Sequence, residues 1–182
     1  MTEMVDNAQR IAEASQLPLV ADADTGYGGP VNVQRTVRAY ERAGAAAIHI
    51  EDQVWPKRCG HLAGKAVIPV EEMVAKIRAG LDAKLDPDFV LIARSDALAV
   101  EGFERTVERC KRYEEAGADM VFLEAPSEMA HLAAIPKAFK KPTLYNMASS
   151  GKTPFLPIDE IGRLGFKLVI YPNFALLSAI TA

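Results

Sequence analysis

Short runs of apolar and β-branched residues recur along the chain at regular intervals, with polar or glycine-containing segments between them. Runs of this length and composition predict strands that are buried on both faces. Six of them stand out, at residues 19–23, 47–50, 89–93, 120–123, 142–145 and 167–171.

Amphipathic helical patterns separate these runs. Val33, Val37 and Tyr40 are spaced four and three residues apart, which places one apolar stripe on a helix. The same spacing recurs at Met73, Ile77 and Leu81 and at Phe103, Val107 and Cys110. Glycines that would end helices precede the second, fourth and sixth runs, at Gly44, Gly117 and Gly165. The repeated βα unit predicts a parallel sheet, either doubly wound or closed into a (β/α)8 TIM barrel.

Polar residues follow almost every predicted strand, and they favour the barrel. A barrel concentrates its chemistry at the carboxyl ends of its strands, whereas a doubly wound sheet binds ligands at one switch point. Gly26, Gly28 and Gly29 match neither a dinucleotide-binding nor a phosphate-binding loop, so nucleotide binding is not expected. The residues that would form the barrel rim are Asp22, Asp24, Glu51, Asp52, Arg94, Asp96, Glu124 and Asn146.

The number of units is too small for a closed barrel. We predict six strands where eight are needed, and residues 1–16 already form a helical pattern, so we expect a strand before Met1 and a further unit after Ala182. We interpret residues 1–182 as a single (β/α) barrel domain of about six βα units that lacks the first strand and the C-terminal helices.

Composition and charge narrow the range of partners. The 182 residues include 21 Lys and Arg against 24 Asp and Glu, a formal charge of −3, and 49% are apolar, as in one globular domain. The sequence has no basic stripe of the kind that predicts nucleic-acid binding, and it has no apolar run long enough to cross a membrane. Two cysteines and no signal sequence favour a cytoplasmic location. Small anionic substrates remain compatible with local positive charge.

Carboxylates are expected to meet at the rim. Residues two apart in a strand share a face, so Asp22 would point with Asp24 and His49 with Glu51. Like charges this close repel unless a cation or a proton lies between them, and clustered carboxylate oxygens favour Mg²⁺ or Mn²⁺ over zinc. The alternative is that Asp24 and Asp52 cap helices, as acids at strand ends often do.

The one long connection, residues 52–69, carries a cysteine between charged neighbours. Cys59 could act as a general acid and base or as a nucleophile, with Lys57 and His61 binding anionic oxygens beside it. The alternatives are an ordinary exposed basic loop, or a zinc site for which only Cys59 and His61 would be at hand. Cys110 lies on an apolar helical stripe and is expected in the core.

Two further features could bind an anionic ligand. Arg94 carries a planar, permanently charged group suited to a carboxylate, and its alternative is an ion pair with Asp96 or Glu124. Residues 146–154 combine an amide, hydroxyls and a glycine at a strand end, which suits an anionic oxygen as well as a plain loop.

Four ordered motifs resemble the isocitrate lyase and phosphoenolpyruvate mutase superfamily. They are Ala-Asp-Ala-Asp-Thr-Gly-Tyr-Gly at 21–28, His-Ile-Glu-Asp-Gln at 49–53, Lys-Arg-Cys-Gly-His at 57–61 and Ala-Arg-Ser-Asp-Ala at 93–97. The resemblance covers essentially the whole chain and is strongest to the methylisocitrate lyase and dimethylmalate lyase branch, which carries the cysteine motif. It implies a (β/α)8 barrel that forms homotetramers.

The resemblance also implies roles for individual residues. Asp22 resembles the main Mg²⁺ ligand of the family, and Asp24 and Glu51 resemble carboxylates that hold the ion directly or through water. Cys59 resembles the catalytic acid. The resemblance implies that Arg94, Glu124, Asn146 and Asp24 bind the substrate. It implies that Lys57 and His61 are catalytic residues of the mobile loop that closes over the site.

The implied activity is Mg²⁺-dependent carbon–carbon cleavage of a small 2-hydroxy di- or tricarboxylate, of the 2-methylisocitrate or 2,3-dimethylmalate type, to a 2-oxo acid and a carboxylate. One alternative is mutase-like carbon–phosphorus chemistry or oxaloacetate hydrolysis or decarboxylation, which Cys59 disfavours in most branches. Another is an inactive truncated barrel. Related lyases commonly carry a glutamate where this chain has Ser149, so the pattern leaves the substrate open.

Overall fold

The computed structural model describes residues 1–148 and 151–181 as an alternation of strands and helices. The strands are β1 (Leu19–Asp22), β2 (Ala45–Glu51), β3 (Val90–Ser95), β4 (Met120–Leu123), β5 (Leu144–Asn146) and β6 (Leu168–Ile170). The helices are α1 (Thr2–Ser15), α2 (Pro30–Arg42), α3 (Val70–Ala83), α4 (Leu98–Glu101), α5 (Phe103–Glu115), α6 (Met129–Ala138), α7 (Ile158–Leu164) and α8 (Phe174–Thr181). All six predicted strands are confirmed.

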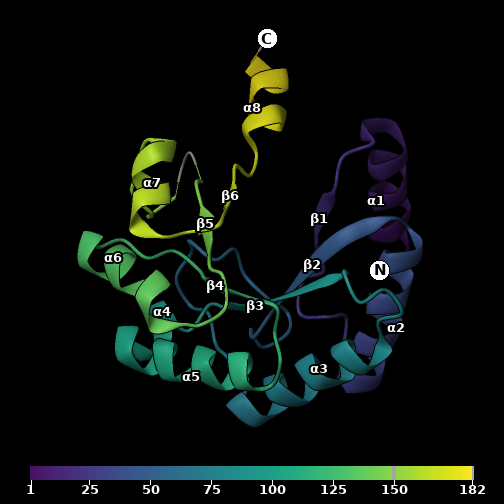
Figure 1. Cartoon of the computed structure of the whole chain (residues 1–182), viewed down its shortest axis with the longest axis horizontal. Coiled ribbons are helices and arrows are strands. Elements are labelled where there is room, and N and C mark those ends of the chain that lie inside the picture. Colours follow the sequence, from purple (N-terminus) through teal and green to yellow (C-terminus); the bar gives the residue numbers. More distant parts are fainter. Residues whose placement is uncertain (149–150, 182) are drawn as a thin grey trace.

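The strands are parallel and lie side by side in the order of the sequence. One sheet runs β1-β2-β3-β4 and a second runs β5-β6. A parallel bridge between Val121 and Thr143 joins β4 to β5, so the six strands form one continuous arc (Figure 1). A doubly wound sheet reverses its strand order at a switch point, and this sheet does not. The fold is therefore the arc of a (β/α) barrel.

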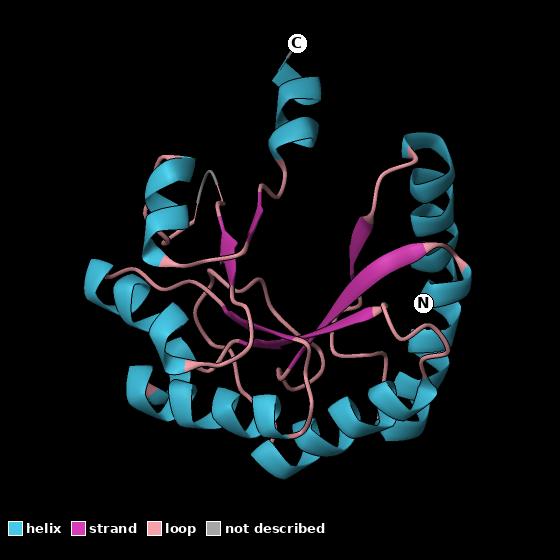
Figure 2. Cartoon of the chain, in the orientation of Figure 1, coloured by secondary structure: helices cyan, strands magenta, loops and turns pink. Residues whose placement is uncertain are grey.

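The two faces of the arc carry different cores. Helices α1 to α3 and α5 to α7 pack against its outer side, over a large cluster that includes Val37, Ile48, Ile77, Leu91 and Tyr113. Helix α8 projects beyond β6 at the end of the arc instead (Figure 2). A second, smaller cluster lines the inner side. It takes alternate residues from each strand, as the two-residue period of a strand requires. Its members are Val20, Ala47, Val90, Ile92, Met120, Phe122, Leu144, Leu168 and Ile170.

Burial on both faces holds for the central strands and is wrong for the outer two. β2, β3 and β4 are almost wholly buried, whereas every residue of β1 and β6 is only half-buried. β1 and β6 each pair with one neighbour among the described residues, because they are the two ends of the arc. In the described part of the chain, no helix is long and apolar enough to span a membrane.

Candidate active site

The inner face of the arc changes from apolar to polar at the carboxyl ends of the strands. In β1 to β5, the residue two positions beyond the inner apolar layer points the same way and is polar, whereas in β6 Leu168 is followed by the apolar Ile170. Val20 is followed by Asp22, Ala47 by His49 and then Glu51, Ile92 by Arg94, Phe122 by Glu124, and Leu144 by Asn146. The Arg94 guanidinium lies 5.2 Å from the centre of the Phe122 ring, so the apolar layer forms the floor of this polar rim.

Three carboxylates of the rim lie around β1 and β2. Asp22 ends β1, and the buried Glu51 ends β2. The strand alternation predicted for Asp24 is wrong, because the chain leaves the strand after Asp22 and Asp24 has a φ of 49°. Its N–H donates to Asp22 Oδ1 at 2.8 Å, and its carbonyl accepts from the Glu51 N–H at 2.8 Å. A tight turn, rather than a shared strand face, brings Asp24 to the rim.

Lys57 balances part of this negative charge. Its Nζ lies 2.8 Å from Asp24 Oδ1 and 3.6 Å from Glu51 Oε2. Burial favours the neutral form of Glu51 and raises its pKa to about 7, although Arg94 and Lys57 oppose this effect. Burial also lowers the pKa of His49 to about 4, so its imidazole is neutral near pH 7. Glu51 is thus a carboxylate that gains from a further cation.

Arg94 is buried at the centre of the rim. It forms the ion pairs with Asp96 and Glu124 that the sequence offered as the alternative to ligand binding. Its Nε donates to Asp96 Oδ2 at 2.9 Å and lies 3.3 Å from Glu51 Oε2, and its Nη2 lies 3.7 Å from Glu124 Oε1. These ion pairs raise the pKa of Arg94 above its ordinary value despite burial. Among the described residues, none of these contacts uses Nη1, so the guanidinium retains a donor for an anionic ligand.

Glu124 is contacted by the end of β5 and by the loop after β2. Asn146 Nδ2 donates to both of its carboxylate oxygens, at 3.2 and 3.1 Å, and His61 Nε2 lies 3.2 Å from Oε1. The Lys152 N–H donates to His61 Nδ1 at 3.1 Å. His61 therefore links the loop after β2 to the loop after β5. Ser149, at the position where related lyases commonly carry a glutamate, lies outside the described residues.

The loop after β2 covers this part of the rim. Gly60 is buried, and a Cβ placed on it would lie 2.5 Å from Glu124 Oε1 and 2.7 Å from Arg94 Nη2. Only a residue without a side chain can approach the two groups this closely. Cys59 precedes Gly60, is exposed, and is a free thiol. The predicted catalytic loop therefore lies against the predicted substrate residues.

Buried polar atoms without hydrogen-bond partners gather at the rim. In the described part of the chain, seven buried side-chain nitrogens or oxygens have no hydrogen-bond partner, and four belong to His49, Glu51, His61 and Asn146. Most buried polar atoms in proteins are satisfied, so a cluster of exceptions marks a place for a ligand.

The charge of the rim fits a divalent cation. Five carboxylates (Asp22, Asp24, Glu51, Asp96 and Glu124) face three cations (Lys57, Lys65 and Arg94), so 3 − 5 leaves −2 when all are ionised. No three Asp, Glu, His or Cys side chains of the described residues form a ready-made cage. Mg²⁺ suits such a site, since it keeps several water ligands and needs only one or two protein carboxylates.

The helix-capping alternative from the sequence is wrong, and so is the rim position predicted for Asp52. Asp24 and Asp52 cap no helix, because α2 begins after Gly29 and α3 after Pro69. Asp52 faces the outer layer instead, where Tyr113 and Ser95 donate to it at 2.8 and 2.7 Å. Cys110 is fully buried, as predicted.

Sequence reasoning missed two polar residues of the loop. Gln53 is buried, donates to Glu51 Oε1 at 3.0 Å and to the Arg58 carbonyl at 2.8 Å, and accepts from the Arg58 N–H. Lys65 places a buried ammonium group beside Asp96. Gln53 follows Glu51 by two residues, which was a usable signal, whereas nothing in the local pattern distinguishes Lys65 from an exposed lysine.

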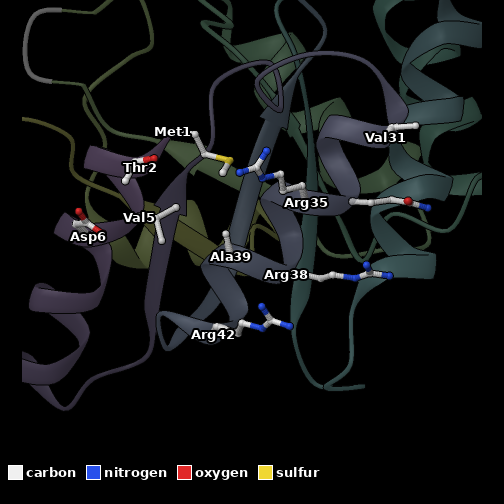
Figure 3. Close-up of a pocket in the computed structure, with 10 residues that line it drawn as sticks. Met1, Thr2, Val5, Asp6, Val31, Arg35, Arg38, Ala39 and Arg42 are labelled. Carbon is white, nitrogen blue, oxygen red and sulfur yellow. The ribbon is translucent and has the colours of Figure 1, made fainter.

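A cavity of about 570 Å³ lies away from the rim, between α1 and α2 (Figure 3). Arg35, Arg38 and Arg42 of α2 and Asp6 of α1 contribute to its wall. None of the predicted site residues lines it. The convergent acids, cations and unsatisfied atoms therefore make the rim, and not this cavity, the candidate active site.

The fold is that of a (β/α)-barrel chain, and its candidate active site lies at the carboxyl ends of the strands. The chain belongs to the phosphoenolpyruvate phosphomutase family, whose model matches residues 1–182. This confirms the superfamily suggested by the four motifs.

Two relatives of similar sequence are named as lyases. The chain is 46% identical over 182 residues to a 2,3-dimethylmalate lyase of Eubacterium barkeri, covering 100% of this chain and 63% of the relative. It is 47% identical over 172 residues to a 2-methylisocitrate lyase of Shewanella oneidensis, covering 94% of this chain and 59% of the relative. The chain thus spans about three fifths of the length of these relatives.

Solved structures agree with this placement. A crystal structure of 2,3-dimethylmalate lyase superposes with a TM-score of 0.95 at 42% identity, covering 99% of this chain and 61% of that one. A phosphonopyruvate hydrolase in complex with oxalate and Mg²⁺ superposes with a TM-score of 0.85 at 34% identity, covering 100% and 63%.

Proposed function

We propose that the protein carrying this chain is a Mg²⁺-dependent carbon–carbon lyase. Its substrate would be a small 2-hydroxy di- or tricarboxylate of the 2,3-dimethylmalate or 2-methylisocitrate type. The observation that carries the proposal is the rim itself, where surplus carboxylates, Arg94 and the Cys59 loop meet over an apolar floor. Relatives with these two activities are 46% and 47% identical to the chain.

Asp22, Asp24 and Glu51 would hold the cation, directly or through water. The Oε2 of the buried Glu51, which accepts no hydrogen bond, and the rim's net charge of −2 support this assignment. Bound Mg²⁺ supplies a positive centre that polarises the oxygens of a 2-hydroxy acid and stabilises negative charge on them.

The side chains supply binding and proton transfer. Arg94 would bind a substrate carboxylate through its free donor, and Asn146 and Glu124 would orient the substrate beside it. The bond between the hydroxyl-bearing carbon and its neighbour breaks and the electron pair stays on the neighbour. The hydroxyl becomes the 2-oxo group as its proton passes to solvent water. The Cys59 thiol then protonates the neighbouring carbon, and solvent water returns a proton to the thiolate before the next turnover.

The test is a coupled assay for release of a 2-oxo acid. The intact protein and the 182-residue chain are each supplied with 2,3-dimethylmalate, 2-methylisocitrate, isocitrate and oxaloacetate, with Mg²⁺ or with excess EDTA. We expect Mg²⁺-dependent cleavage of one of the first two acids by the intact protein. Turnover of oxaloacetate alone, or of no acid, would contradict the proposal.

The two cysteines provide a matched pair of variants. Cys59→Ser should lower kcat by about 100-fold or more, since it removes the proposed proton donor. Cys110→Ala removes a buried thiol of α5 and should leave kcat within about threefold, because it leaves the rim intact. Equal effects of the two substitutions would remove Cys59 from the mechanism.

A further inference from the structure

The loop between β2 and α3 contains a lysine whose ammonium group is buried. The Lys65 side chain is only 2% exposed. A buried ammonium group is costly unless it is paired and hydrogen-bonded. Lys65 Nζ donates to the Gly60 carbonyl and lies 3.5 Å from Asp96 Oδ1, so its burial is compensated by one group on the loop and one on the barrel.

Lys65 lies at the neck of the loop. The Val54 N–H donates to the Ala66 carbonyl at 2.8 Å, and the Ile68 N–H donates to the Asp52 carbonyl at 2.9 Å. These bonds fasten the two ends of the loop together, while residues 55–64 extend beyond them. Lys65 reaches from this neck to Gly60, in the middle of the extended part.

The bond to Gly60 acts next to the proposed proton donor. The Gly60 backbone rests on Glu124 and Arg94, and Cys59 is its direct neighbour in the chain. A movement of the Gly60 carbonyl therefore carries the Cys59 backbone with it. A shift of about 1 Å in a reacting group can cost about 100-fold in rate.

Asp96 connects Lys65 to the substrate side of the rim. Arg94 donates to both Asp96 oxygens, at 2.9 and 3.3 Å, and Asp96 is fully buried. The end of β3 thus supplies one anchor for both Arg94 and the loop. We propose that Lys65 is a positioning residue, whose ammonium group ties the Gly60 carbonyl to Asp96 and so holds Cys59 over the rim.

The catalytic part of this proposal rests on the proposed lyase function, so the experiment has one arm that needs no turnover. Hydrogen–deuterium exchange of the intact protein reports directly on residues 55–64. Lys65→Met keeps the length of the side chain but removes its charge and its donors. Exchange in this segment should become at least tenfold faster, with exchange in β2 and β3 unchanged.

The kinetic arm separates positioning from binding. Lys65→Met should lower kcat by about 100-fold while KM and the Kd of oxalate with Mg²⁺ stay within about threefold, because Arg94 and the rim acids remain. Lys65→Arg, which retains charge and donors, should recover most of kcat. The exposed Lys111→Met on α5 is the control and should change neither measurement.

Gly60→Ala tests the same loop position from the other side. The added Cβ would collide with Glu124 and Arg94, so it should reproduce the faster exchange and the lower kcat without touching Lys65. Gly29→Ala is its control, since a Cβ there meets nothing within 4 Å.

Unchanged exchange in residues 55–64 of Lys65→Met would overturn the proposal, as would a loss of oxalate binding equal to the loss of kcat. If the wild-type protein shows no lyase turnover, the proposed function fails. The exchange arm then still decides whether Lys65 holds the loop.

Discussion

Glu51 and Asp52 are consecutive, both fully buried, and satisfied to very different degrees. Asp52 accepts hydrogen bonds from Ser95, Asp96 and Tyr113 and lies 3.7 Å from Arg109 Nη1. Glu51 accepts one hydrogen bond, from Gln53. Its Oε2 accepts none, although Arg94 Nε and Lys57 Nζ lie 3.3 and 3.6 Å away. Asp52 serves the layer between sheet and helices, and Glu51 serves the rim. A saturated carboxylate holds elements together, whereas an unsaturated one is left for a ligand.

The largest expected effect is on activity, where substitutions of Glu51 and of Asp52 should differ most. Glu51→Gln and Asp22→Asn should each lower kcat/KM for the cleaved acid by about 1000-fold or more, because they remove charge that would hold the cation. Asp52→Asn should retain turnover at a temperature where it is folded. Steady-state kinetics with saturating Mg²⁺ is the measurement. A Glu51→Gln enzyme with normal turnover would end the distinction.

The reactivity of the two thiols compares the rim with the layer between sheet and helices, because Cys59 lies on the loop at the rim and Cys110 lies in that layer. Cys59 is exposed on the loop, whereas burial raises the pKa of Cys110 well above its ordinary value. At pH 8, a thiol reagent should modify Cys59 about 1000-fold faster than Cys110, which reacts only when the fold opens. Mass spectrometry of partly labelled protein assigns each site, and Cys59→Ser should abolish the fast phase. Comparable rates would mean that the outer layer is not closed.

The Glu51→Gln and Asp52→Asn substitutions should rank in the opposite order when the free energy of unfolding is measured in place of activity. Asp52→Asn weakens a network that joins β2, β3 and α5, and should lower the free energy of unfolding by about 2–3 kcal/mol. Glu51→Gln removes a charge that burial disfavours, so its unfolding free energy should fall by less than about 1 kcal/mol. Urea denaturation at pH 7 in EDTA measures both. A larger loss for Glu51→Gln would assign the structural role to the rim.

The smallest effect is stabilisation by the metal. Mg²⁺ at ten times its Kd should add about 1.4 kcal/mol to the folded state, which is about 3–5 °C in Tm for a chain of this size. Glu51→Gln should lose this shift, and Asp52→Asn should keep it from a lower starting Tm. A shift retained by Glu51→Gln would place the cation elsewhere.

The sequence pattern predicted the strands and most rim residues, because both follow from local periodicity. Five rim residues lie at inward positions, two residues beyond an apolar inward residue, so the two-residue period of a strand identifies them. They are Asp22, Glu51, Arg94, Glu124 and Asn146. The half-burial of β1 and β6 depends on how many neighbours a strand has, which is a property of the whole sheet.

Other features depended on the path of the chain outside regular elements. Asp24 reaches the rim through a backbone turn at positive φ, which strand alternation cannot anticipate. Lys65 is buried only because the loop folds back onto Asp96. α6 contains Pro136, a residue that usually ends a helix, so its continuation to Ala138 had no clear local signal.

The central claim is that the rim binds a divalent cation and an anionic ligand together. Calorimetric titration of oxalate into the intact protein, with Mg²⁺ and then with EDTA, tests it without requiring turnover. We expect oxalate to bind at least about 100-fold more tightly with Mg²⁺, Glu51→Gln to abolish this difference, and Asp52→Asn to preserve it. Equal oxalate affinity with and without Mg²⁺ in the wild-type protein would contradict the account.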